Sequence, residues 1–155
     1  MIVSFKGDYF FLSNFFPCPI ETNLYGTIYT FPTVEHAFQA SKIPEKHQDM
    51  IREFHTAHIT PAEAKRLGRL VPLRIDWEDV KLQIMTELVR TKFRNPVLGG
   101  KLKNTNPHEL IHGNNHHDRF WGAEFDHLRI LRGENHLGKI SMGVRAELLD
   151  SERVS

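Results

Sequence analysis

The segment from Trp77 to Phe93 constrains the fold most, because its apolar side chains recur at steps of three and four residues. Such spacing places side chains on one face of an α-helix. That face carries Trp77, Val80, Ile84, Leu88 and Val89. Asp76 precedes the segment and can cap its first turn, since aspartate is a preferred N-cap residue. We therefore predict that this is the longest helix of the chain and that it lies in the core.

Start and stop signals predict three more helices before this segment. A helix opens at Pro32 or Thr33 and stops before Pro44, because the residue preceding a proline disfavours helical dihedral angles. A second helix runs from about Glu45 to Thr56. Thr-Pro-Ala-Glu at positions 60–63 is a capping box with proline at the first helical position, so a third helix starts there and reaches about residue 70.

The two ends of the chain have different patterns. The first thirty residues are rich in aromatic and β-branched side chains and contain turn-forming proline and glycine, which predicts short strands, a turn or hairpin and little helix. Towards the C-terminus, NPVLGGKLKNT predicts a short helix broken by two glycines, and HELIHGN a short strand or single turn. GKISMGVRAELLD predicts a last helix with Ile140, Val144 and Leu148 on one side. The sum is an α+β fold: one mostly helical domain over residues 1–150 with a small N-terminal β-part, followed by a tail at 151–155.

The charge and cysteine content exclude several classes of protein. Twenty basic and 19 acidic residues leave a formal charge of +1, so contact with nucleic acid would need a local patch. Cys18 is the only cysteine, which rules out an intrachain disulfide and a multi-cysteine zinc site and fits a cytoplasmic protein. With no basic neighbour close in sequence, Cys18 is better explained as a small buried side chain than as a nucleophile. The first residues lack the features of a signal peptide or membrane span, so no membrane partner is expected.

One motif raises the question of a metal. HELIH at 108–112 matches the HExxH pattern, in which two histidines one helical turn apart bind zinc and the glutamate polarises water. Pro107 and Gly113 leave room for only a short helix. Asn115 stands where the extended motif has glycine, although Asp118 is available as a third ligand. A polar surface loop therefore explains these residues better than a zinc hydrolase, and we expect neither a metal nor another cofactor.

A group of polar side chains lies on one face of the helix that opens near Thr33. Glu35, Gln39 and Lys42 are spaced at i, i+4 and i+7. Charged residues at helical spacing usually form a solvated surface. The aromatic segments FFLSNFF and YTFP close to this helix favour a second interpretation, in which they form a pocket that turns the carboxylate into a usable acid or base.

Two further features have both a structural and a functional interpretation. Trp121 stands next to Gly122, which permits close backbone approach, so the tryptophan ring can either stack on a base or belong to the core. Lys65, Arg66 and Arg69 in AKRLGR form the only compact basic cluster of the sequence. A solvated helix face explains this cluster as well as a contact with nucleic acid does.

Five ordered sequence blocks resemble the NADAR family, also called YbiA-like. They are FLSNFFPCPI; FPTVEHAFQASK; AKRLGR with VPLRIDWEDVKLQIM and KF; DRFWG; and NHLGKISMGVR. The resemblance runs from about Phe10 to Leu148. It implies the YbiA-like fold, compatible with the α+β domain above, and an N-glycosidase that cleaves the bond between a ribose carbon and a ring nitrogen.

The resemblance also implies site residues. Glu35 stands at the family's essential glutamate and Lys42 at the lysine that ends the same block, which makes these two the candidate catalytic residues. Substrate contacts are expected at the other matching positions: Ser13, Asn14, Phe15, Gln39, Trp77, Trp121, Gly122 and Asn135.

The resemblance implies two substrate classes. The one we favour is ADP-ribose attached to guanine in nucleic acid, with transient DNA contact. The other comprises phosphorylated ribosylamino intermediates of riboflavin biosynthesis. A non-catalytic module that binds ADP-ribose or nucleotides is the alternative outside enzymes, and the oligomeric state stays open.

The sequence departs from the family pattern after Trp121, where many relatives have an acidic residue and a glycine-rich loop. Here the chain reads WGAEFDHLRILRGEN, with Ala123 at the acidic position and Glu124 one place later. A glycine-rich loop offers backbone donors to phosphate groups, and bulkier residues withhold them. The difference favours a substrate other than that of bacterial housekeeping relatives.

Two mechanisms fit these residues. Cleavage of a ribosyl C–N bond develops positive charge on the sugar and negative charge on the departing ring, and Glu35 is the expected acid/base catalyst. In one mechanism the Lys42 amine attacks the anomeric carbon and forms a Schiff base with ring-opened ribose. In the other, water attacks directly and Lys42 holds a phosphate or a hydroxyl.

Overall fold

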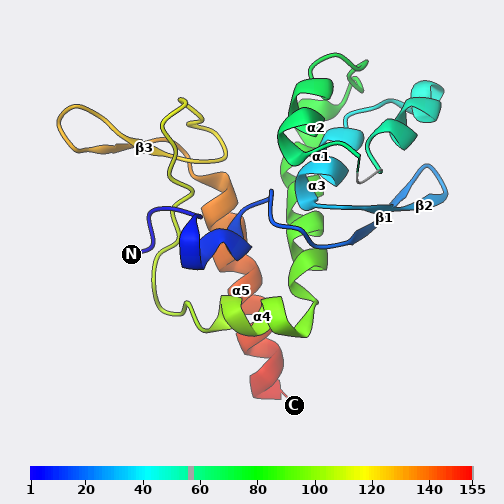
Figure 1. Cartoon of the computed structure of the whole chain (residues 1–155). Helices are drawn as coiled ribbons and strands as arrows, with labels where there is room; N and C mark the ends of the chain where they lie inside the picture. The colour runs from blue at the N-terminus through cyan, green and yellow to red at the C-terminus, as the bar shows by residue number, and fades with distance from the viewer. Residues whose placement is uncertain (56–57, 155) are drawn as a thin grey trace. The chain divides into compact units, whose positions relative to one another are not determined.

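The computed structural model describes residues 1–55 and 58–154, and Figure 1 labels the α-helices and most of the strands. The chain divides into two compact units. Unit 1 joins Met1–Ser13 to Phe93–Ser155, and unit 2 is the continuous stretch Asn14–Lys92. In the stretches that the structure describes, no helix has the length and apolar character needed to cross a membrane.

Unit 2 starts with a β-hairpin. Strand β1 (Ile20–Leu24) pairs antiparallel with β2 (Thr27–Phe31), and both Ile20 and its partner Phe31 are fully buried. Tyr25 (φ 54°) and Gly26 (φ 86°) form the turn, in which positive φ at both positions matches the twist of the strands. The hairpin predicted from the aromatic N-terminal sequence is confirmed. The same stretch of sequence also contains η1 (Gly7–Leu12), a 3-10 helix of unit 1 where little helix was predicted.

The helices of unit 2 follow the predicted order. They are α1 (Val34–Ala40), η2 (Glu45–Glu53), α2 (Pro61–Leu67) and α3 (Trp77–Phe93), whose last residue belongs to unit 1. Thr60 and Glu63 form the predicted capping box: the Thr60 hydroxyl accepts from the Glu63 amide and the Glu63 carboxylate from the Thr60 amide. η2 is a 3-10 helix, and its predicted end at residue 56 lies outside the described residues.

The longest helix is α5 (His136–Val154) with 19 residues, not α3 with 17, so the prediction for α3 was wrong in this respect. Its prediction as a core helix holds, because Trp77, Leu88 and Val89 are buried. The apolar pattern of α5 ends near Leu148, but its last turn is held by ion pairs, one between Arg153 and Asp150 at 3.7 Å and another between Glu152 and Lys103. Beyond residue 150 the helix therefore has exposed ion pairs in place of apolar burial.

Unit 1 also contains α4 (Pro96–Lys103), which packs against α5 and is continuous through Gly99 and Gly100. The predicted break in this helix was wrong. A Cβ on Gly99 would lie 2.6 Å from the Phe93 carbonyl oxygen, so this glycine allows a close contact and does not end the helix. The short strands β3 (Glu124–Phe125) and β4 (Leu131–Arg132) form the second hairpin.

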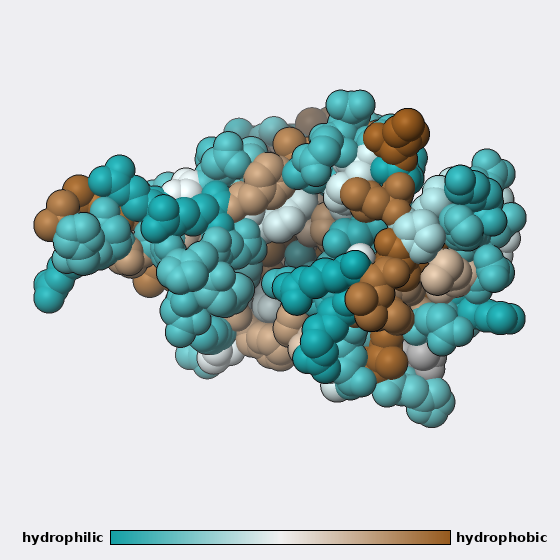
Figure 2. All heavy atoms as spheres, turned by 90° about the horizontal axis from the view of Figure 1, so that it is seen from above, coloured by the Kyte–Doolittle hydropathy of each residue, from teal (hydrophilic) through white to brown (hydrophobic). Residues whose placement is uncertain are grey.

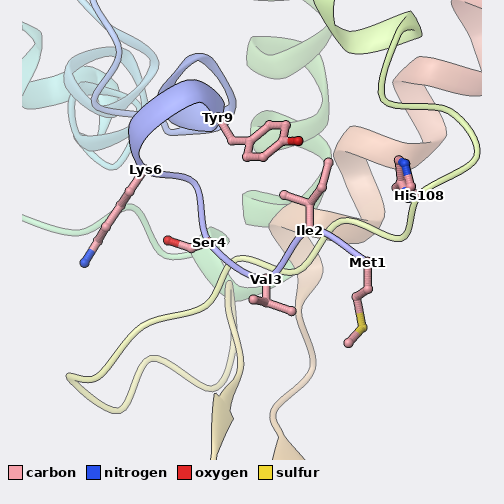
Figure 3. Close-up of a pocket in the computed structure, with 7 residues that line it drawn as sticks. All are labelled: Met1, Ile2, Val3, Ser4, Lys6, Tyr9 and His108. Carbon is pink, nitrogen blue, oxygen red and sulfur yellow. The ribbon is translucent and has the colours of Figure 1, made fainter.

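The N-terminal residues of unit 1 run beside the HELIH segment. Ile2 bridges Leu110 in a parallel pair, with the Ile2 amide donating to the Glu109 carbonyl at 2.8 Å. This agrees with the short strand or turn predicted for HELIHGN. A pocket of about 350 Å³ lies at this place. Figure 3 shows the residues that line it: Met1, Ile2, Val3, Ser4, Lys6, Tyr9 and His108.

Candidate active site

Helix α1 is buried along its whole length, because it packs against α2 and against both strands of the first hairpin. Thr33 caps it, with its hydroxyl oxygen accepting from the His36 amide at 3.2 Å. Glu35 is 6% exposed and Gln39 is 4% exposed. The interpretation of the Glu35, Gln39 and Lys42 face as a solvated surface was therefore wrong.

Glu35 and Gln39 form one hydrogen-bonded pair. The Gln39 Nε2 donates to Glu35 Oε1 at 2.8 Å, as the spacing of one helical turn allows. The other end of the amide, Gln39 Oε1, is buried and has no hydrogen-bond partner in the described part of the chain. The Gln39 amide therefore orients the Glu35 carboxylate, and its Oε1 remains a buried acceptor that a ligand can use.

Gly68, at the C-cap of α2, leaves the space that the Gln39 side chain occupies. An ideal Cβ on Gly68 would lie 1.9 Å from Gln39 Oε1 and 2.7 Å from its Cδ, so no side chain fits there while Gln39 keeps its position. This role was not predicted from the sequence, although Gly68 lies in the AKRLGR block. The signal is its position between Lys65 and Arg69, which share one face of the helix with it.

We predict that Gly68→Ala lowers catalytic activity more than it lowers stability. The helical φ of −61° suits alanine, but the new methyl group displaces the Gln39 amide and with it the Glu35 carboxylate. A misplacement of about 1 Å costs up to about 100-fold in rate. Turnover and thermal unfolding of Gly68→Ala are compared with those of Gly100→Ala, because a Cβ on Gly100 meets nothing within 4 Å. Full activity in Gly68→Ala would contradict the proposed contact.

Lys42 lies just past the end of α1 and is half-buried. Its ammonium nitrogen is 6.0 Å from the centre of the Trp77 ring, within the range of a cation–π contact. Burial lowers the pKa of Lys42 below its usual value, and the positive charges of Arg69 and Lys65 lower it further, whereas the Glu35 carboxylate opposes the shift. The Glu35 carboxylate is thus close enough to the Lys42 amine to act on its charge.

The aromatic ring beside Lys42, Trp77, packs in turn on a second ring. Trp77 is 6% exposed and packs on Phe38 of α1, with ring centroids 5.0 Å apart at an angle of 53°. Trp77 was predicted as a substrate contact. The structure places it beside the candidate catalytic lysine, with most of its surface covered by the protein.

Asn14, from the Ser-Asn-Phe sequence at positions 13–15, contacts α1 through its backbone carbonyl. The Glu35 amide donates to the Asn14 carbonyl at 3.1 Å, and the Asn14 side chain donates to the Met85 sulfur of α3 at 3.5 Å. Asn14 is 9% exposed, and Phe15 is half-buried beside it in the chain. Ser13 is the C-cap of η1 in unit 1, where its amide donates to the Phe10 carbonyl. Unit 2 therefore brings Asn14, Glu35, Gln39, Lys42 and Trp77 together.

In unit 1, three other predicted site residues lie together: Trp121, Gly122 and Asn135. Trp121 is half-buried. Its ring and that of Phe120 form a T-shaped pair, with ring centroids 4.8 Å apart and an angle of 89° between the ring planes. A Cβ on Gly122 would lie 2.2 Å from the His112 carbonyl oxygen. The close backbone approach inferred for this glycine is therefore made by the protein's own chain.

Asn135 connects this segment to residues 110–112. Its side-chain oxygen accepts from the His112 amide at 2.9 Å, and its side-chain nitrogen donates to the Leu110 carbonyl at 2.9 Å. Its φ of 52° lies in the left-handed region, which asparagine tolerates better than most residues. Asn135 was predicted as a substrate contact, and these bonds give it a structural role in addition.

We predict that Asn135→Ala destabilises the protein by about 2–4 kcal/mol, because two backbone groups lose their partner and alanine disfavours positive φ. Denaturant unfolding measures the loss. Asn135→Gly, which loses the same bonds but adopts the positive φ without strain, should lose less. Equal stability of the alanine variant and the wild type would contradict this role.

Lys92 of α3 is a buried titratable residue for which no role was predicted from the sequence. It is 1% exposed, and its nitrogen lies 5.7 Å from the centre of the Phe16 ring. Burial lowers its pKa from 10.5 to about 7, against the opposing effect of Cys18. Cys18 itself is 6% exposed, as predicted for a small buried side chain, and burial raises its pKa.

The depressed pKa predicts how stability depends on pH. Between about pH 7 and pH 10.5 the unfolded chain binds a proton at Lys92 that the folded protein does not, so this group makes the protein more stable as the pH rises. The free energy of unfolding of the wild type should therefore increase relative to Lys92→Met across this window. The exposed Lys46→Met variant serves as the control and should run parallel to the wild type. Parallel curves for Lys92→Met would contradict the shift.

The HELIH residues have no helical conformation, so His108 and His112 do not share a helix face as zinc ligands of this motif do. In the described residues, no group of three or more histidine, cysteine or acidic side chains is arranged to hold a metal ion. The Asp118 carboxylate, considered as a third ligand, accepts from the amides of Phe120 and Trp121 at 3.2 and 3.0 Å.

The fold is the α+β fold of a solved relative. It superimposes on the NMR structure of the Escherichia coli protein YbiA with a TM-score of 0.74 at 34% identity, covering 97% of this chain and 84% of that one. The family model of the NADAR domain matches residues 4–149. The chain belongs to the NADAR domain family, and the family and fold class expected from the sequence are confirmed.

Two relatives show the extent of the similarity. The N-glycosidase YbiA of Escherichia coli is 37% identical over 149 residues, which cover 94% of this chain and 85% of YbiA. The riboflavin biosynthesis protein PYRR, chloroplastic, of maize is 35% identical over 150 residues. That match covers 88% of this chain but only 23% of the longer maize protein.

Proposed function

We propose that this chain is an N-glycosidase that hydrolyses the bond between ribose and a nucleobase and removes ADP-ribose from guanine in nucleic acid. The observation that carries the proposal is the buried Glu35 carboxylate, held by Gln39 beside an amine whose pKa is lowered. The name of the relative YbiA, an N-glycosidase, supports the reaction type. A cytoplasmic location forms part of the proposal.

In the proposed reaction Glu35 handles the proton. It protonates the departing ring nitrogen or activates the attacking group, and either role suits a carboxyl group in a buried site. Gln39 keeps the carboxylate in place, and its unused Oε1 can accept a hydrogen bond from a ribose hydroxyl. Asn14 lies against the start of the same helix and is the next candidate for a sugar contact.

In the covalent form of the reaction, the neutral Lys42 amine attacks the anomeric carbon, the C–N bond to the base breaks, and the base leaves with a proton. Opening of the ribose ring then gives a Schiff base. Water hydrolyses this intermediate, which frees the sugar and restores the amine. A lowered pKa favours this route because it increases the fraction of neutral amine near pH 7.

Two cations beside Lys42 favour a phosphorylated substrate. Lys65 and Arg69 both lower the pKa of Lys42, so their charges act at the same place. Neither side chain forms an ion pair with a described residue. Cations held close to one another without a partner bind phosphate groups well. Both a diphosphate and a ribose phosphate meet this requirement.

The second candidate substrate is a phosphorylated ribosylamino intermediate of riboflavin biosynthesis. It is favoured by the name of the maize relative, a riboflavin biosynthesis protein. The two substrates share the ribosyl C–N bond and a phosphate, and they differ in the base and in the presence of a nucleic-acid strand.

The test is mass spectrometry of the products formed by wild-type protein and by Glu35→Gln. One substrate is DNA that carries ADP-ribosyl-guanine, and the other is a ribosylamino-pyrimidine phosphate. Release of ADP-ribose by the wild type alone supports the proposal. Cleavage of the pyrimidine substrate only would replace it by the second candidate, and cleavage of neither would favour a non-catalytic binding module.

A further inference from the structure

The hairpin of β3 and β4 is preorganised by a single aspartate. Asp126 Oδ1 accepts from the amides of Leu128 and Ile130 at 2.8 and 2.9 Å, and the Asp126 amide donates to the Ile130 carbonyl at 2.9 Å. These bonds hold Arg129 at the tip with a φ of 62°. Figure 1 shows that the hairpin extends away from α5, to which it is connected. A partner therefore meets a hairpin whose turn is already ordered.

The charge that this hairpin presents to solvent is positive. The Glu124 side chain is 10% exposed and pairs with Arg119, which is 54% exposed. The Asp126 side chain is 14% exposed and pairs with Arg132, which is 52% exposed. Between Glu124 and Arg132 the acids are thus turned inward and the guanidinium groups outward, whereas Glu134, past the end of β4, is 61% exposed. Arg129 is exposed and has no ion pair within the described residues.

The hairpin also exposes large apolar side chains. Phe125 is 52% exposed, Leu128 is 64% exposed and Ile130 is 46% exposed. In Figure 2 the hairpin projects at the left, with hydrophobic and hydrophilic residues side by side. An exposed aromatic ring next to guanidinium groups suits a nucleic-acid strand, because bases stack on the ring and phosphates pair with the cations.

The base of the hairpin is bonded to two candidate substrate contacts. Asn135 donates from its amide to the Gly122 carbonyl at 3.1 Å, and the Leu137 amide donates to the Trp121 carbonyl at 2.9 Å. Gly133, with a φ of 133°, allows this closure, because a Cβ there would lie 2.6 Å from the Gly122 carbonyl oxygen. These bonds keep the hairpin close to Trp121, so a nucleic-acid strand bound to the hairpin also lies near Trp121.

We propose that the β3–β4 hairpin binds the nucleic-acid strand that carries the modified guanine, with Phe125 stacking on a base and Arg129 contacting a phosphate. This inference rests on the proposed function and names the element that would distinguish a strand from a free nucleotide. The exposed cations argue against a basic protein partner. An acidic protein or an anionic membrane would use the same charges, and both are therefore included as alternatives in the test.

The test compares Phe125→Thr/Arg129→Asn with a matched control, Arg94→Asn/Val97→Thr. Threonine suits a strand and asparagine tolerates positive φ, so the hairpin can keep its conformation. The control removes an exposed arginine and an exposed valine from α4 and the residues just before it in the same unit. Fluorescence anisotropy measures binding of a short, unmodified, labelled DNA strand. Turnover is measured on ADP-ribosyl-guanine within that strand and on the same linkage in a free nucleoside.

The hairpin variant should bind the strand about tenfold more weakly and with a smaller salt dependence, the size expected for loss of one stacked base and one phosphate contact. Its kcat/KM should fall on the strand and stay unchanged on the nucleoside, whereas the control should match the wild type on both. Equal binding by variant and wild type, or equal loss on both substrates, would overturn the proposal, as would selective binding to an acidic peptide or to phosphatidylserine vesicles. If the wild type cleaves neither substrate, the proposed function fails, and the anisotropy measurement still decides the role of the hairpin.

Discussion

Replacing Glu35 by glutamine is expected to lower kcat by about 10²- to 10⁴-fold, the contribution typical of a general acid or base. The fold should survive, because the glutamine carbonyl oxygen can still accept the hydrogen bond from Gln39 Nε2, which spans 2.8 Å in the wild type. The measurement is the rate of base release at saturating substrate, combined with thermal unfolding of both proteins.

Glu45→Gln is the matched control for this substitution, since Glu45 is an exposed glutamate of η2 in the same unit. It should retain wild-type turnover. If Glu35→Gln also retained most of its activity, the carboxylate would have no catalytic role, and the buried pair with Gln39 would be a structural feature only.

Lys42 is expected to be indispensable as an amine. Lys42→Arg keeps the positive charge but cannot attack carbon, so it should be as inactive as Lys42→Met, with a loss of at least about 10³-fold. Borohydride added during turnover should leave a sugar adduct on the wild-type lysine. Because burial lowers the pKa of Lys42, kcat should rise with pH and level off below pH 10.5, the ordinary value for a lysine.

The exposed Lys46 provides the control, since Lys46→Arg should keep full activity and form no adduct. Appreciable activity in Lys42→Arg, together with no adduct on the wild type, would exclude the covalent mechanism. Direct attack by water, with Lys42 holding a phosphate or hydroxyl, would then explain the site.

The elements that could be predicted are those whose signals are local. The capping box at Thr60 and the prolines mark the ends of helices through neighbouring backbone groups, so they appear in the sequence. Gly99 shows the limit of such signals. Its contact with the Phe93 carbonyl depends on how the chain turns before α4, and a glycine that allows a contact looks the same in sequence as one that breaks a helix.

Prediction of the candidate site from the sequence had the same limit. Helical spacing placed Glu35 and Gln39 on one face, but the same spacing describes a surface, and only the packing of α1 against α2 and the hairpin settles their burial. The roles of Gly68 and of the Asn135 side chain depend on contacts between distant residues. No pattern within one helix or loop records those contacts.

The discontinuous composition of unit 1 has a consequence for how the chain folds during synthesis. Asn14–Lys92 is continuous, so all of unit 2 has been made before α4 and α5 exist. The first 13 residues, by contrast, reach their partners only when residues 93–154 follow, and the bridge between Ile2 and Leu110 closes a loop of more than a hundred residues. Contacts of such long sequence separation form late because closing a long loop costs entropy. Phe11 and Leu12 of η1 are buried in the folded protein. During translation these apolar side chains therefore stay exposed to solvent until the rest of unit 1 has been synthesised.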